Sequence, residues 1–241
     1  MKVYWLEQTE ADVPAENDWL SANEAACLKG LRFAKRRADW RLGRWTAKRA
    51  LSVCLDVPAH PEVFKKVEIR PAPSGAPEVF FADQPAAVTI SLTHRAGIAA
   101  CAVTTGSTEI GCDLELVEPR SDAFVADYFT VEEQALVARA STADRPWLLA
   151  LLWSSKESAL KALHEGLRLD TRCMIVSPFD ESFDLNGWSP LRVRYTGVVA
   201  FHGWWRHTEN FVRTVVAAPA PDSPIRLSVP PHFFDCVSGC A

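Results

Sequence analysis

The stretch Trp45-Thr-Ala-Lys-Arg49 is matched later in the chain by Trp153-Ser-Ser-Lys-Glu157. Both place a tryptophan, a small hydroxyl residue, a small residue and a lysine in the same order, within a segment that has the apolar spacing of a helix. Self-similarity of this kind indicates a repeated structural unit. We therefore expect an α+β fold of two similar halves, each a long helix packed on a small antiparallel sheet, with the active site in the cleft between them.

Long helices are predicted around both stretches. Residues 33–54 lack proline and carry apolar side chains at steps of three or four, and residues 146–164 form a leucine-rich segment that we expect to end at Gly166. Ahead of the second segment, Thr130-Val-Glu-Glu133 has the spacing of a capping box, in which a threonine and a glutamate satisfy free amides at a helix start. A shorter helix is therefore predicted to begin there.

Short apolar runs bounded by turn residues predict the strands. In the first half two runs flank the turn Arg95-Ala-Gly97, and in the second half one run precedes the helices and three follow them. The polar residues 104–108 mark a boundary, so we assign 1–107 to the first half, 108–217 to the second and 218–241 to a proline-rich tail that we expect to be irregular or wrapped over the surface. The predicted strands are 88–94, 98–103, 109–116, 191–196, 198–205 and 211–217.

The composition is typical of a folded protein without membrane segments. With 241 residues, of which 48% are hydrophobic, the chain can fill two cores. It has no apolar run of signal-peptide length at its start and no 18 consecutive apolar residues, so we expect a cytoplasmic protein with no membrane partner. Seven scattered cysteines lack the spacing of a zinc site or a disulfide framework and are predicted to be reduced thiols.

Positive charge is concentrated in one segment although the net charge is −4. Between Lys29 and Arg49 the chain has nine lysine or arginine residues and a single acidic residue, Asp39. Such a segment is expected to meet an anion. A nucleic-acid backbone is one alternative, because Trp40 and Trp45 lie among the cations. Nucleic-acid binding would leave the carboxylates described next unexplained, and we expect no nucleic-acid partner.

Asp113 and Glu115 are two residues apart on a predicted strand, so both side chains point to the same face. Neighbouring carboxylates repel one another unless a cation or a proton lies between them. Mg²⁺ prefers oxygen ligands and leaves room for water and substrate phosphates. The pair is therefore a candidate cation site, although a solvated strand face is the simpler explanation when the pair is taken alone.

Glu157 and Lys161 are four residues apart on the second long helix and project from one side of it. On their own they could be an ordinary surface ion pair, which contributes little to stability. Together with Asp113, Glu115 and the basic segment they supply oxygen ligands for a metal, a base and cations for phosphates. This combination is typical of a phosphoryl-transfer site.

The order of these motifs resembles that of a known family. Ile110-Gly-Cys-Asp-Leu-Glu115 and the segment Trp153–Lys161 are similar to the paired signature of the 4'-phosphopantetheinyl transferase superfamily. Further matches are Lys35–Lys48, Ser91-Leu-Thr-His94 and Gly75-Ala-Pro77. The resemblance covers about residues 30–170 and is closer to the larger, two-halved subfamily typified by the surfactin-synthetase activator than to the short trimeric type.

The resemblance implies an enzyme that transfers 4'-phosphopantetheine from coenzyme A to a serine of an apo acyl or peptidyl carrier protein and releases 3',5'-ADP. It implies that Asp113, Glu115 and Glu157 hold Mg²⁺, with Mn²⁺ as an alternative. Glu157 and Lys161 would be the catalytic residues, Glu157 as the base and Lys161 as the group that stabilises phosphate charge. The partner could belong to fatty-acid, polyketide or nonribosomal peptide synthesis, and the enzyme is expected to be a monomer.

The resemblance also implies a set of residues for coenzyme A, which would be the co-substrate. One position departs from the family pattern, because Ala76 stands where the family has a lysine, and Arg70 or Lys66 could supply the missing charge. A coenzyme A or carrier-protein binding module without catalysis stays open as an alternative. The coenzyme A set is Arg36, Arg44, Lys48, Gly75, Pro77, Thr93, His94, Lys156 and Lys161.

Overall fold

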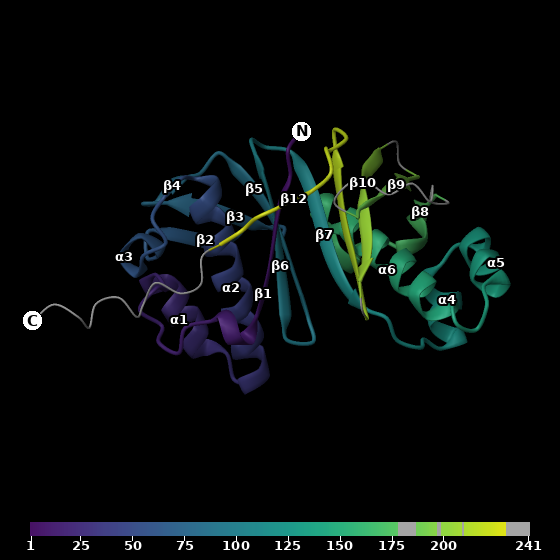
Figure 1. Cartoon of the computed structure of the whole chain (residues 1–241), viewed down its shortest axis with the longest axis horizontal. Coiled ribbons are helices and arrows are strands. Elements are labelled where there is room, and N and C mark those ends of the chain that lie inside the picture. The colour runs from purple at the N-terminus through teal and green to yellow at the C-terminus, as the bar shows by residue number, and fades with distance from the viewer. Residues whose placement is uncertain (178–186, 197–198, 209, 230–241) are drawn as a thin grey trace, which may run out of the picture.

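The computed structural model describes residues 1–177, 187–196, 199–208 and 210–229 as two sheets between two long helices. Helix α2 (Ala34–Cys54) packs on the first sheet and helix α6 (Arg145–Ala162) packs on the second. The two sheets meet between them, so the layers run helix, sheet, sheet, helix across the molecule (Figure 1). The expected α+β class is confirmed.

The first sheet has the strand order β12-β1-β6-β5. Strand β6 pairs antiparallel with both β1 and β5, and β12 is parallel to β1. The bounds are β1 (Tyr4–Thr9), β5 (Val88–Arg95), β6 (Ile98–Thr105) and β12 (Ile225–Arg226). Beside it lie α1 (Ala22–Gly30), α3 (Pro61–Phe64) and a smaller sheet of β2 (Val67–Pro71), β3 (Pro77–Phe81) and β4 (Gln84–Pro85).

The second sheet has the order β7-β11-β10-β9-β8, with every pair antiparallel. Two short helices, α4 and α5, lead into α6. The bounds are β7 (Glu109–Leu116), α4 (Asp122–Tyr128), α5 (Val131–Arg139), β8 (Met174–Val176), β9 (Ser189–Tyr195), β10 (Ala200–Thr208) and β11 (Phe211–Ala218). No helix of the described residues is both long enough and apolar enough to cross a membrane.

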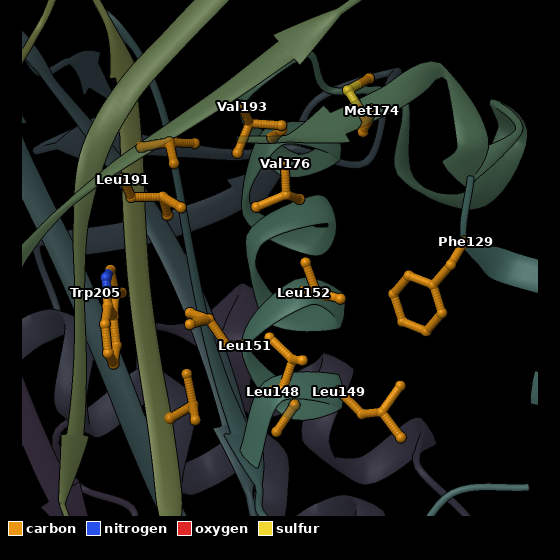
Figure 2. Packing of buried hydrophobic residues seen from close by; sticks show 14 of the residues in the cluster. Phe129, Leu148, Leu149, Leu151, Leu152, Met174, Val176, Leu191, Val193 and Trp205 are labelled. Atoms are coloured by element: carbon orange, nitrogen blue, oxygen red, sulfur yellow. The ribbon is translucent and has the colours of Figure 1, made fainter. Parts of the chain in front are cut away.

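The buried hydrophobic residues lie between the successive layers of the fold. The largest apolar cluster lies between α6 and the second sheet, and Figure 2 shows leucines of α6 reaching toward Trp205 on one side and toward Phe129 on the other. A second cluster joins α2 to the first sheet, and a third fills the space between the two sheets with Trp5 and Trp188 in edge-to-face contact. Alternation of side chains along each strand lets one sheet bury both faces.

Several predicted elements are confirmed, and the end of one helix differs from the expectation. The helix predicted over 33–54 is α2, and the Thr130–Glu133 capping box begins α5. Helix α6 ends at Ala162 rather than near Gly166, because His164 already has a left-handed backbone with φ of +57°. Gly166 begins a 3₁₀ turn instead.

Part of the tail lies along an edge of the first sheet. Ile225 and Arg226 form strand β12 beside β1, and Leu227 is buried in the cluster between α2 and the first sheet. The sequence did not indicate β1 either, because its polar and apolar residues do not alternate cleanly. Of the segments expected from the sequence, residue 198 and residues 230–241 lie outside the described part of the chain.

Candidate active site

Helix α6 lies directly on strand β7, and a glycine permits this approach. A Cβ atom at Gly111 would lie 1.8 Å from the carbonyl oxygen of Ser158, which no real side chain could tolerate. Behind the contact, the hydroxyl of Thr214 is hydrogen-bonded to those of Ser154 and Ser158 at 2.8 and 2.7 Å. The result is that the acidic end of β7 and the charged side of α6 are held against each other.

Asp113 is the most enclosed acid of the site, with 5% of its surface exposed. Its Oδ1 atom accepts hydrogen bonds from Lys161 Nζ at 2.8 Å and from the Thr93 hydroxyl at 3.0 Å. Its Oδ2 atom is buried and has no hydrogen-bond partner among the described residues. A buried carboxylate oxygen without a partner is costly, so this atom is suited to a ligand that the chain itself does not provide.

Glu115 and Glu157 complete the acidic group. Glu115 contacts Arg120 at 3.2 Å and Arg95 at 3.8 Å. Glu157 is partly buried and makes no hydrogen bond or ion pair within the described part of the chain. Burial, followed by repulsion from Asp113, raises the pKa of both glutamates. A raised pKa makes a free carboxylate a better proton acceptor, which suits Glu157 to the part of a general base.

Lys161 provides the positive charge at the centre of this group. Its ammonium donates to Asp113 and to the Cys112 carbonyl at 3.0 Å. Burial alone would lower the pKa of Lys161, but attraction to Asp113 more than compensates and the pKa is raised. Lys161 therefore stays protonated, and it also lines a pocket beside the acids.

The three acidic side chains of the site are of the chemical type that binds Mg²⁺. All three donors are carboxylates, and the unpartnered Oδ2 of Asp113 is an oxygen that a hard cation would satisfy. Among the described residues, however, no three ligating side chains are already gathered around one point. Mg²⁺ usually takes only one or two carboxylates together with phosphates and water, so a preformed cage is not required. The predicted set of Asp113, Glu115 and Glu157 stays a prediction.

A pocket of about 370 Å³ lies next to the acids and is lined from both halves of the chain. Gly75 and Pro77, from the turn between β2 and β3, form one wall, and Lys161 with His164 forms the other. Arg44 and Arg70 also line it, and no acidic side chain is among its described lining residues. This charge suits an anionic ligand.

The turn at Gly75 is tied to the opposite half. Arg168 donates to the Ser74 carbonyl at 3.4 Å and to the His164 carbonyl at 2.8 Å, so it bridges the pocket rim. Of the two residues considered as substitutes for a lysine at Ala76, Arg70 lines the pocket, whereas Lys66 is exposed and is not part of the lining. Arg70 is also paired with Glu68 and Asp83 and lies over the ring of Phe80.

Two lysines that were predicted to contact coenzyme A are buried, and the structure contradicts that prediction for both. Lys48 has no exposed surface and is enclosed by Glu24, at 2.5 Å, and by two carbonyls. Lys156 has none either and is enclosed by Glu133, at 2.8 Å, and by two carbonyls. An ammonium whose donors are all used inside the core is not available to a phosphate. Their sequence motif reflects packing rather than ligand contact.

The remaining predicted ligand residues lie around the site in different ways. Arg36 is exposed on the first turn of α2 and is outside the pocket lining. His94 is exposed, with Nε2 3.9 Å from Asp39, and partial burial lowers its pKa. Thr93 is 6% exposed and gives its hydroxyl hydrogen to Asp113, so its contact with a phosphate is not supported.

Sequence reasoning missed two contributors, the close approach at Gly111 and the bridge from Arg168, because both depend on which segments meet in space. It named Thr93 as a coenzyme A contact, but not its hydrogen bond to Asp113. For Gly111 a signal existed, since a glycine inside an apolar strand often marks a close backbone approach. For Arg168 the sequence offered none.

In the comparisons with known proteins, the family match lies in the second half of the chain. Residues 109–218 match the family model of the 4'-phosphopantetheinyl transferase superfamily. A similar solved structure is a holo-(acyl-carrier-protein) synthase from Bacillus anthracis str. Ames in complex with CoA (3',5'-ADP); it is 23% identical, covers 44% of this chain and 96% of its own, and has a TM-score of 0.36. Identity and score are too low to indicate a shared overall fold. The search of curated proteins finds no match.

Proposed function

We propose that the chain is a 4'-phosphopantetheinyl transferase that moves phosphopantetheine from coenzyme A to a serine of an apo acyl or peptidyl carrier protein. The observation that carries the proposal is the match of residues 109–218 to that superfamily, because this segment contains Asp113, Glu115, Glu157 and Lys161. The contact between Lys161 and Asp113 beside a cationic pocket supports it.

In the proposed reaction the serine oxygen forms a bond to the phosphorus that carries pantetheine, and the bond from that phosphorus to 3',5'-ADP breaks. Glu157, whose pKa is raised by burial and by Asp113, accepts the serine proton directly or through a water molecule. Lys161 stabilises negative charge on the phosphates. Asp113, Glu115 and Glu157 would hold Mg²⁺, which when bound neutralises charge on the pyrophosphate of coenzyme A.

We assign coenzyme A binding to residues 1–107 and metal binding with catalysis to residues 108–217. Arg44 and the turn at Gly75 and Pro77 would contact the pyrophosphate or adenosine part, because they line the pocket that Lys161 also lines. Arg36 and His94 would contact phosphates from the rim. The proposal of two similar halves is supported by the matching buried pairs Lys48–Glu24 and Lys156–Glu133, one under each long helix.

The test is mass spectrometry of an apo carrier protein incubated with the chain, coenzyme A and Mg²⁺. We expect the carrier to gain the mass of one phosphopantetheine, with no gain in excess chelator or when the acceptor serine is replaced by alanine. One apo carrier from each of the fatty-acid, polyketide and peptide classes should be used. Binding of coenzyme A without modification of any carrier, under any metal, would favour a silent binding module instead.

A further inference from the structure

A pair of hydroxyl side chains joins the two sheets at the active site. Strands β5 and β7 belong to different sheets, yet Ser91 accepts a hydrogen bond from the Cys112 amide at 2.9 Å and Thr93 accepts one from the Leu114 amide at 3.3 Å. Ser91 and Thr93 are two residues apart, so both point to the same side of β5. Side chains here replace the backbone pairing that would otherwise connect neighbouring strands.

The Thr93 hydroxyl both accepts and donates a hydrogen bond in this arrangement. It accepts from the Leu114 amide and donates its single hydrogen to Asp113 Oδ1 at 3.0 Å. Lys161 donates to the same oxygen at 2.8 Å. The two donors from opposite halves therefore fix Oδ1, and they leave Oδ2 as the buried carboxylate oxygen without a described partner.

We propose that Thr93 is a positioning residue for the metal site: by holding Oδ1 of Asp113 it presents Oδ2 to the cation. The inference rests on the proposed function, and it replaces phosphate binding as the part played by Thr93. A carboxylate that is held by a hydrogen bond binds a metal more tightly than one that rotates freely, because the favourable orientation is already populated.

The experiment measures Mn²⁺ binding, which electron paramagnetic resonance detects through the signal of the free ion, in the full chain without substrates. Thr93→Val removes the hydroxyl at nearly constant volume and should weaken Mn²⁺ binding about 10-fold. Thr93→Ser keeps the hydroxyl and should bind within about twofold of the unaltered chain. If the valine variant does not fold, Thr93→Ala takes its place.

The matched control is Thr104→Val. Thr104 is a fully buried strand threonine whose hydroxyl donates to the Lys2 carbonyl at 3.1 Å, away from the acids, so its loss should leave Mn²⁺ binding unchanged. Equal Mn²⁺ affinity in Thr93→Val and the unaltered chain, or an equal loss in Thr104→Val, would overturn the inference. No Mn²⁺ binding by the unaltered chain would overturn the inference and the metal role of Asp113, whereas the proposed function is tested separately by the transfer of phosphopantetheine to a carrier protein.

Discussion

At the scale of single residues, the site contains one acid that the chain leaves free. Asp113 and Glu115 are both engaged by cations, Asp113 by Lys161 and Glu115 by Arg120. Glu157 makes no hydrogen bond or ion pair with the described residues, and its pKa is raised by burial and then by repulsion from Asp113. A free, partly buried carboxylate beside two restrained ones is the natural candidate for proton transfer.

Replacing Glu157 by glutamine should therefore abolish most of the transfer without unfolding the chain. The amide keeps the shape but cannot accept the serine proton, and it is a weaker metal ligand. We expect the rate of carrier modification to fall by about 10²–10⁴-fold, measured by mass spectrometry over time. Glu62→Gln, on α3, is the control and should keep its rate. A Glu157→Gln variant as fast as the unaltered chain would show that another group accepts the proton.

The cysteines provide a test of burial at single residues. Burial raises the pKa of Cys54 and of Cys112 to about 11, whereas Cys27 is exposed. Only the thiolate reacts with alkylating agents, so iodoacetamide at neutral to mildly basic pH should modify Cys27 and leave Cys54 and Cys112 intact. Peptide mass mapping before and after unfolding measures this. Modification of Cys112 at the rate of Cys27 would mean that the contact between β5 and β7 opens in solution.

At the scale of elements, the site depends on how closely α6 approaches β7. The helix can lie against the strand only because Gly111 has no side chain facing the Ser158 carbonyl. This contact sets the distance between residues on α6 and those on β7, including Lys161 and Asp113. Catalytic geometry is therefore linked to the packing of one helix on one strand.

Gly111→Ala tests that link. The added methyl would force α6 away from β7, and overpacking of this kind costs about 1–3 kcal/mol or more. We expect a lower urea midpoint in unfolding experiments and a loss of transfer larger than the loss of folded protein explains, because Lys161 would move from Asp113. Gly43→Ala is the control, since a methyl group there meets no atom within 4 Å. Equal activity in both variants would disprove the dependence on close approach.

The elements also show what the sequence can predict. Local spacing was sufficient for α2, for the capping box of α5 and for most strands of the second sheet, because these signals lie within a few residues. The same-face rule of a strand correctly placed Asp113 and Glu115 on one strand, β7, whereas their metal role stays a prediction. Lys48 and Lys156 were misassigned because their motif looks the same whether a lysine faces a ligand or the core. Strand β12 depends on a partner more than two hundred residues away, which no local pattern reveals.

At the scale of the whole molecule, the two long helices are anchored by the same device. Each has a buried lysine paired with the capping-box glutamate of a shorter helix, and the glutamate also accepts hydrogen bonds from its own cap residue and from a strand amide. The two sets use the same glutamate oxygens for the same partners. They are Lys48, Glu24, Ser21 and Ile69 in the first half and Lys156, Glu133, Thr130 and Val176 in the second.

If the two halves are equivalent, substitutions at matching positions should lower the free energy of unfolding by similar amounts. Lys48→Met and Lys156→Met each remove the closest cation of a buried glutamate, and Glu24 keeps only Arg44 at 3.9 Å. Breaking a buried pair in this way typically lowers the free energy of unfolding by about 3–5 kcal/mol. We expect losses of this size for both variants in urea or guanidinium titrations. Lys65→Met is the control, because Lys65 pairs with exposed Glu62 at 2.5 Å and water screens that pair, so stability should hardly change.

The two lysine variants should differ in function even if they agree in stability. Lys156 directly precedes Glu157, so its loss should reduce transfer by the protein that remains folded, whereas Lys48→Met should affect coenzyme A affinity through the helix that carries Arg44. Unfolding, coenzyme A affinity and transfer rate should be measured in both variants. These measurements distinguish the stabilising effect that both lysines share from the different effects on function. A small stability loss in one variant beside a large loss in the other would mean that only one pair anchors its helix, and the proposal of equivalent halves would fail.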